Sequence, residues 1–151
     1  MEDNISAFVS RQLHATYDKS EWLVSFQQAV KSLTESQAKE KIHDNLPTIF
    51  EIVTHFTYWN EWHLRRIQGK RKEETITDNR QTFTENNLAS WNELYSKTCS
   101  VFEEWLIALE TLSEKEIPLI QNLIIHNAYH IGQIVFIRKL QNSWNNEDGV
   151  S

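Results

Sequence analysis

Two histidines, His126 and His130, lie four residues apart in the C-terminal part of the sequence. On an α-helix this spacing places both side chains on one face, about 6 Å apart along the axis, so both imidazoles can point at one metal ion. Zinc-peptidase helices use the same spacing, with a glutamate general base directly after the first histidine. Here Asn127 occupies that position. The spacing therefore predicts a metal site but argues against a zinc peptidase of that type.

The histidine pair lies on a seam of residues spaced by three and four, which predicts one buried helix face. Three consecutive members in the middle of this seam are polar, although a polar group in a core costs about 2 kcal/mol or more unless it is satisfied. A shared metal ion would explain them; two unrelated histidines satisfied by the backbone are the alternative. The seam consists of Leu119, Leu123, His126, His130, Gln133, Ile137 and Leu140.

A third ligand is needed, because two histidines hold a metal weakly. Of the four remaining histidines, His14 and His43 lie in polar surroundings. His55 shares a helical stripe with Trp59 and Trp62, so we expect it to face protein. His63 lies eight residues later, about 12 Å along a helix, so it cannot easily share a site with His55. The pattern favours His55 only modestly among the candidates His14, His43, His55 and His63.

Long helices are expected to position these residues. The chain has only 3 glycines and 2 prolines, too few for the many tight turns of a sandwich or barrel. We predict a single all-α domain over residues 1–151, a four-helix bundle with a long polar connection, residues 70–83, between helices 2 and 3. The helices are expected at about 5–33, 47–69, 85–112 and 118–141.

Apolar side chains recur at helical spacing in the first and third segments. Gln12 and Lys19 interrupt the first stripe, which allows a bend there. The fourth segment is apolar on most sides and is expected to be the most buried. The polar tail, from about residue 142, is expected to fray. The first stripe is Phe8, Ala15, Trp22, Phe26, Ala29 and Leu33; the third is Leu88, Trp91, Tyr95, Thr98, Phe102, Trp105, Leu109 and Leu112.

The composition limits which binding partners and which cellular compartment we expect for this protein. The formal net charge of −6 argues against non-specific nucleic-acid binding, which depends on neutralising phosphates. No stretch approaches the roughly 18 apolar residues that span a bilayer. The single cysteine, Cys99, cannot form an internal disulfide, and no signal peptide is visible at the N-terminus. These features favour a cytoplasmic protein that does not enter the membrane.

The run His126–Ile134, His-Asn-Ala-Tyr-His-Ile-Gly-Gln-Ile, resembles the C-terminal motif of the DinB/YfiT-like family of metalloenzymes, which is His, three residues, His, one residue, Gly-Gln. The stretch 52–69 is similar to the family's second helix, which carries its first metal-binding histidine midway. The resemblance covers about residues 8–140. It implies a metal triad of His55, His126 and His130, a four-helix bundle with a long link after the second helix, and frequent homodimers.

Three neutral histidines would leave at least one open position on the metal. Bound water would suit hydrolysis, and a bound thiol would suit transfer to an electrophile. The resemblance implies the second chemistry for some members, with low-molecular-weight thiols such as bacillithiol, mycothiol or glutathione. Zinc or nickel suits imidazole ligands best, with iron or manganese as alternatives. Gln133, Trp59 and Tyr129 are candidates to orient ligands or line the pocket; a plain buried hydrogen bond or core packing is the alternative for each.

We therefore expect a metal-dependent thiol S-transferase or hydrolase acting on a small molecule. Two other classes stay open from the sequence. One is a non-catalytic protein that binds a metal or small ligand in a stress response. The other is a structural dimerisation bundle in which the histidines are hydrogen-bonded without metal.

Overall fold

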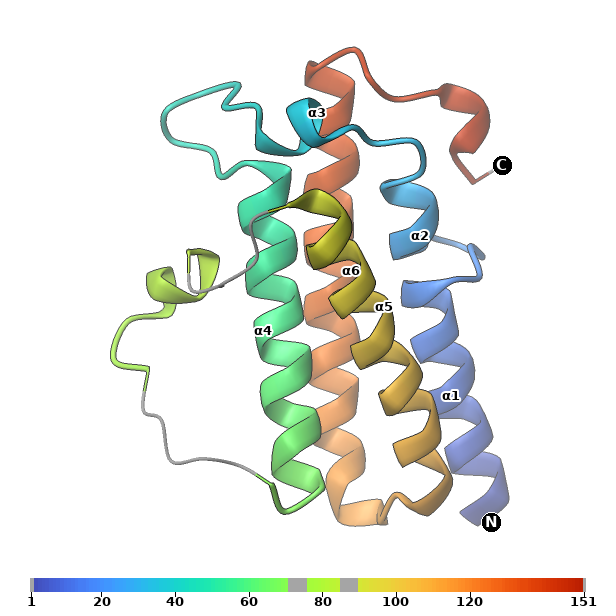
Figure 1. Ribbon diagram of the computed structural model, residues 1–151. Coiled ribbons are helices and arrows are strands. Elements are labelled where there is room, and N and C mark those ends of the chain that lie inside the picture. Colours follow the sequence, from blue (N-terminus) through green and yellow to red (C-terminus); the bar gives the residue numbers. More distant parts are fainter. Residues whose placement is uncertain (1, 71–75, 85–89, 151) are drawn as a thin grey trace. The chain divides into compact units, whose positions relative to one another are not determined.

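A computed structural model describes residues 2–70, 76–84 and 90–150, and every regular element within them is helical (Figure 1). The predicted all-α class is confirmed, and the arrangement as a four-helix bundle stays a prediction. The chain divides into two compact units: unit 1, Met1–Leu33 with Leu106–Ser151, and unit 2, Thr34–Trp105. The four long helices are α1 (Glu2–Tyr17), α4 (Ile49–Ile67), α5 (Trp91–Ala108) and α6 (Ile117–Leu140).

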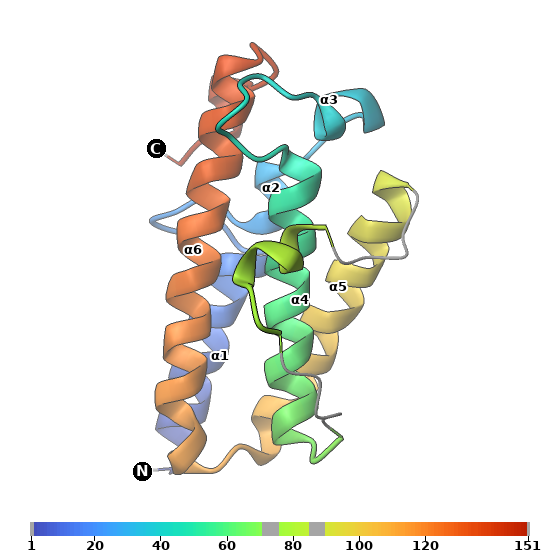
Figure 2. The same cartoon turned by 90° about the vertical axis from the view of Figure 1, so that its left-hand side faces the viewer.

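In unit 1, α6 lies along α1, and the short helix α2 (Phe26–Ala29) packs against both (Figures 1 and 2). Pro118 lies in the first turn of α6, where its missing N–H costs nothing. The helix keeps a mostly aliphatic buried stripe that Asn127 shares, while Ile125 and Phe136 stay exposed. The buried face of α6 is therefore rotated about the helix axis relative to part of the predicted seam. The buried stripe includes Ile120, Ile124, Asn127, Ile131 and Ile134.

The predicted first helix is not continuous. It ends at Tyr17, where the amides of Asp18 and Lys19 both donate to the carbonyl of His14. The chain resumes helical form at Phe26, after Ser25, whose hydroxyl accepts from the α2 backbone. Serine side chains that bond to nearby backbone compete with helix in this way. Trp22, expected in the core stripe, lies in this break and is 96% exposed, and Phe8 is also exposed.

The C-terminal tail is ordered, contrary to the predicted fraying. Asn142 takes a left-handed conformation (φ 56°) and ends α6, and the amide of Ser143 donates to the carbonyl of Arg138. Farther on, Asp148 in the 3₁₀ turn η4 (Asn146–Asp148) accepts from Gln28 at 2.9 Å. These contacts dock the tail on the region of α2.

In unit 2, the second helix is present, and α4 begins and ends two residues inside its predicted bounds of about 47 and 69. A capping box starts α4: the Thr48 hydroxyl accepts from the Glu51 amide, and the Glu51 carboxylate accepts from the Thr48 amide. Gly69 ends it with φ +67°, a conformation that favours glycine. The expected connector before it contains the short helix α3 (Glu35–Lys39), which packs on α4.

The third helix packs on α4 through its predicted seam. Trp105 donates its indole N–H to the carbonyl of Asn60 at 2.9 Å, and Thr57 and Thr98 share a hydroxyl hydrogen bond of 2.6 Å. Phe102 lies against Phe56, with ring centroids 5.4 Å apart. The predicted start of this helix, residues 85–89, and the seam residue Leu88 lie outside the described residues.

The described part of the long connection, residues 70 and 76–83, contains one further element. The 3₁₀ turn η1 (Asn79–Phe83) lies against α4 (Figure 2). Across the described part of the chain, no helix is both long enough and apolar enough to cross a bilayer.

Candidate metal centre

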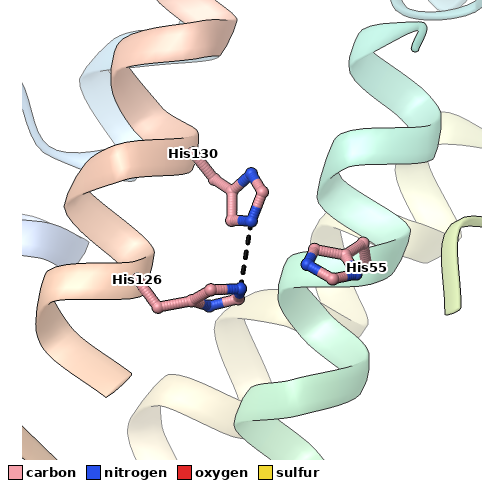
Figure 3. A group of neighbouring side chains, drawn as sticks. All are labelled: His55, His126 and His130. Carbon is pink, nitrogen blue, oxygen red and sulfur yellow. Dashed lines mark hydrogen bonds between the residues drawn. The ribbon is translucent and has the colours of Figure 1, made fainter. Parts of the chain in front are cut away.

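The histidine pair of α6 is brought together as predicted. The Nε2 atoms of His126 and His130 lie 3.0 Å apart, and the rings meet nearly edge to face with centroids 4.4 Å apart (Figure 3). His130 is buried, and His126 is half-buried. One helix thus presents two imidazole nitrogens at a common point.

Gln133 fixes the proton on the far side of His130. Its side-chain oxygen lies 2.7 Å from Nδ1 of His130, so this nitrogen carries a proton and donates it. The amide nitrogen of Gln133 donates in turn to the hydroxyl of Tyr129 at 3.0 Å. The Nε2 of a neutral His130 therefore carries a lone pair, and in the 3.0 Å contact the proton comes from His126.

Burial lowers the pKa of His130 below its ordinary value, and the hydrogen bond to Gln133 opposes this shift only in part. The shift favours the neutral form of His130. A neutral imidazole is the form that binds a metal, so the burial of His130 reduces competition from protons.

In unit 2, His55 also has its Nδ1 atom engaged in a hydrogen bond. It is buried on α4, and its Nδ1 lies 2.5 Å from the hydroxyl of Thr82 in η1. That hydroxyl already donates to the carbonyl of Asn79 at 2.6 Å, so it accepts from Nδ1–H of His55. The lone pair of His55 is then on Nε2. The ring of Phe83 stacks on the imidazole at 4.1 Å, with 10° between the planes.

Thr82 and Phe83 were not among the predicted site residues. They lie 27 and 28 residues after His55, in a connector read only as polar and long. The one signal was Phe83 itself, because the connector holds only one other apolar residue, Ile76.

The three pocket candidates have different outcomes. Gln133 is hydrogen-bonded to His130, a contact that both the ligand-orienting interpretation and a plain hydrogen bond predict. Tyr129 is 63% exposed, so core packing is wrong for it. Trp59 is half-buried and donates its indole N–H to Asn79 at 3.1 Å.

The other histidines are placed elsewhere. His14 bonds to Asp18 at 2.7 Å on α1, and His43 is exposed. His63 lies among aromatic rings of α4, with Trp62 at 4.7 Å between centroids.

Within the described ranges, one group of three histidine, cysteine or acidic side chains could hold a metal ion: His55, His126 and His130 (Figure 3). The donor set fits a divalent metal, because all three donors are imidazoles. In His55 and His130 the Nδ1 proton is engaged, which leaves Nε2 as the donor atom. The identity of the metal stays a prediction.

Comparison with protein families, curated proteins and solved structures gives no match for this chain. The resemblance to the DinB/YfiT-like family therefore rests on the sequence motifs alone.

Proposed function

We propose that this protein is a divalent-metal-dependent enzyme that acts on a small molecule, as a thiol S-transferase or a hydrolase. His55, His126 and His130 would hold the metal. The observation that carries the proposal is the orientation of two imidazoles by outer hydrogen bonds, which His130 donates to Gln133 and His55 donates to Thr82. Metal-ligating histidines almost always make such a bond with the nitrogen that faces away from the metal.

The proposal includes membership of the DinB/YfiT-like family, and with it the four-helix bundle and the homodimer. It also includes zinc or nickel as the metal and a low-molecular-weight thiol as the partner in transfer. What supports these finer points is the motif from His126 to Gln133 and the position of His55 within α4.

When bound, the metal would supply a Lewis-acidic centre that lowers the pKa of a coordinated water or thiol. The chain's own residues have separate tasks. Burial of His130 favours its neutral form, in which the nitrogen lone pair is available to a metal. Gln133 and Thr82 hold the Nδ1 protons of their histidines and so fix the ring orientations. Phe83 covers one face of the His55 ring and so limits how that ring can turn.

Elemental analysis of the protein purified without an affinity tag tests the metal assignment. We expect about one equivalent of zinc or nickel after reconstitution, consistent with a single three-imidazole site. The variants His55→Ala and His130→Ala should each retain less than about a tenth of that metal. His63→Ala is the matched control, because it removes a histidine two turns away on the same helix as His55. Loss of metal in His63→Ala but not in His55→Ala, or no metal in the wild type, would contradict the assignment of the three ligands.

Activity is tested on the metal-loaded protein with cysteine, glutathione, bacillithiol or mycothiol and a generic electrophile such as 1-chloro-2,4-dinitrobenzene. Hydrolysis of p-nitrophenyl esters is measured in parallel. We expect one of the two reactions to depend on metal and to disappear in His130→Ala. Stoichiometric metal without either reaction would favour the non-catalytic binding protein. No metal at all would favour the structural bundle.

A further inference from the structure

The 3₁₀ turn η1 is joined to α4 at two points. At one of them, the indole N–H of Trp59 donates to the side-chain oxygen of Asn79 at 3.1 Å. At the other, Nδ1 of His55 lies 2.5 Å from the hydroxyl of Thr82. The contact of η1 with α4 can be followed in Figure 2. A proposed metal ligand and the residue one helical turn after it therefore hold the same short segment.

The two attachment points have the same spacing on both elements. His55 and Trp59 are four residues apart on α4, about 6 Å along its axis. Asn79 and Thr82 are three residues apart in η1. Residues at this spacing lie above one another in a 3₁₀ helix, also about 6 Å apart along the axis. One turn of η1 therefore matches one turn of α4.

Hydrogen bonds within η1 connect the two attachment points. The hydroxyl of Thr82 donates to the backbone carbonyl of Asn79 at 2.6 Å. Asp78 caps the start of the turn, because its carboxylate accepts from the amide of Arg80 at 2.9 Å. These bonds tie the position of the Thr82 hydroxyl to that of Asn79.

The two attachment points differ in exposure. His55 and Thr82 are buried, whereas Asn79 is exposed. The indole N–H of tryptophan can only donate, so Asn79 must present its oxygen to Trp59 and not its amide nitrogen. Asn79 therefore contributes a hydrogen-bond acceptor at the surface and no volume to the core.

We infer that Asn79 is a positioning residue for His55. By accepting the indole N–H of Trp59, it holds η1 on α4. The Thr82 hydroxyl then stays on Nδ1–H of His55, and the lone pair stays on Nε2, where the proposed metal would use it. The effect on metal binding rests on the proposed function; the effect on the tautomer of His55 does not.

The tautomer of His55 in the metal-free protein tests this role. Long-range ¹H–¹⁵N NMR spectra of the full-length, tag-free protein in excess chelator distinguish Nδ1–H from Nε2–H, at a pH where imidazoles are neutral. His55→Ala assigns the signals. We expect Nδ1–H in the wild type. Asn79→Ala should lower the ratio of Nδ1–H to Nε2–H about threefold or more, as expected for the loss of one hydrogen bond.

Two other variants of η1 are controls. Asn79→Asp keeps an acceptor oxygen for the indole and should retain the wild-type tautomer. Gln81→Ala removes an exposed amide side chain from the same turn and should also leave the tautomer unchanged. Nε2–H in the wild type, an unchanged ratio in Asn79→Ala, or an equal change in Asn79→Asp overturns the positioning role.

Trp59→Phe removes the indole N–H and keeps an aromatic ring. It should lower the tautomer ratio as Asn79→Ala does, and the double variant should show no further change, because both substitutions break the same hydrogen bond. Circular dichroism checks the fold of each variant; the Asn79 variants decide the question if Trp59→Phe unfolds. Additive changes in a folded double variant would contradict the shared route.

Zinc affinity, measured by competition with a chromophoric chelator, keeps the two proposals apart. Asn79→Ala should bind zinc about threefold to tenfold more weakly than the wild type, and Asn79→Asp should bind it equally well. Unchanged zinc affinity beside a changed tautomer would contradict the effect on the metal. The expected tautomers in a protein that takes up no zinc or nickel would keep the positioning role and remove the proposed function. Stoichiometric metal with an unchanged tautomer in Asn79→Ala would do the reverse.

Discussion

Outer hydrogen bonds decide which nitrogen each proposed ligand offers. Thr82 and Gln133 belong to different parts of the chain, yet each binds the Nδ1 proton of a histidine. The two contacts differ in origin. Gln133 is three residues from His130 on the same helix, whereas Thr82 reaches His55 from a separate turn.

The variant Thr82→Val keeps the shape of the side chain and removes its hydroxyl. Because His55 then loses the acceptor for Nδ1–H, we expect metal affinity to fall about 10- to 100-fold. Competition with a chromophoric chelator measures it. Thr84→Val is the control, because this hydroxyl donates to the carbonyl of Gln81 and not to a histidine among the described residues. Equal affinities in the two variants would show that Thr82 does not orient a ligand.

At the scale of elements, Arg138 joins three segments of unit 1. Its buried guanidinium donates to the carbonyl of Ala29 at 2.8 Å, of Lys31 at 3.1 Å and of Ser143 at 2.6 Å. It also lies over the ring of Trp144. One side chain therefore fixes both the end of α2 and the start of the tail against α6.

Arg138→Met should destabilise the protein by about 3 kcal/mol, because it leaves buried carbonyls without a donor. Urea unfolding followed by circular dichroism measures the change in the free energy of unfolding. Lys139→Met, at the exposed neighbouring position, should change it by less than about 0.5 kcal/mol. A similarly small change in the free energy of unfolding for Arg138→Met would contradict the role of Arg138 in holding α2 and the tail against α6.

Asp148 makes the docking of the tail dependent on pH. The pKa of its carboxyl lies below its ordinary value, chiefly because Lys31 donates a hydrogen bond to it at 2.8 Å. A carboxyl with a lowered pKa in the folded state contributes stability above its unfolded pKa of about 3.9, and this contribution is lost as the pH falls through the folded value.

We therefore expect Asp148→Ala to lower the melting temperature at pH 6 and to differ less and less from the wild type as the pH falls below about 3.9. Differential scanning calorimetry from pH 6 to pH 3 measures the difference. Glu147→Ala removes the exposed neighbouring carboxylate and should show a smaller difference at pH 6. A deficit of Asp148→Ala that stays constant with pH would refute the ion-pair explanation.

At the scale of the whole molecule, the proposed metal site would combine His55 with His126 and His130. A metal that binds only the folded state adds stability by mass action, about 2.7 kcal/mol at a free concentration 100 times the dissociation constant. We expect added zinc or nickel to raise the melting temperature of the wild type and of His63→Ala, but not of His55→Ala. Stabilisation of all three alike would mean that the metal binds elsewhere.

The proposed homodimer has a candidate surface. Ile125, Tyr129 and Phe136 are exposed on α6 at spacings of four and seven residues, which places them on one stripe. Light scattering during size-exclusion chromatography should give about twice the chain mass of 17.9 kDa for the wild type. Phe136→Glu should give the monomer mass. Trp22→Glu, at an exposed apolar position outside α6, is the control. A wild-type monomer at every concentration would reject the dimer.

The sequence by itself determined the local features. The four-residue spacing of His126 and His130 and the end of the second helix at Gly69 each depend on residues within one or two turns, and both agree with the prediction. The all-helical class followed in the same way from periodicity and the scarcity of glycine and proline. Such patterns report the geometry of one helix, which is fixed by the chain's own period.

Only the tertiary structure decided which distant segments meet. The partner of His55 comes from a turn 27 residues later, and the tail is held by residues more than 100 positions earlier. Trp22 had the spacing of a core residue but lies in a break of the helix. The helical period shows which side chains share one face of a helix, but not which other segment packs against that face. The surroundings of a histidine and the exposure of a tryptophan depend on the packing of segments that no local pattern records.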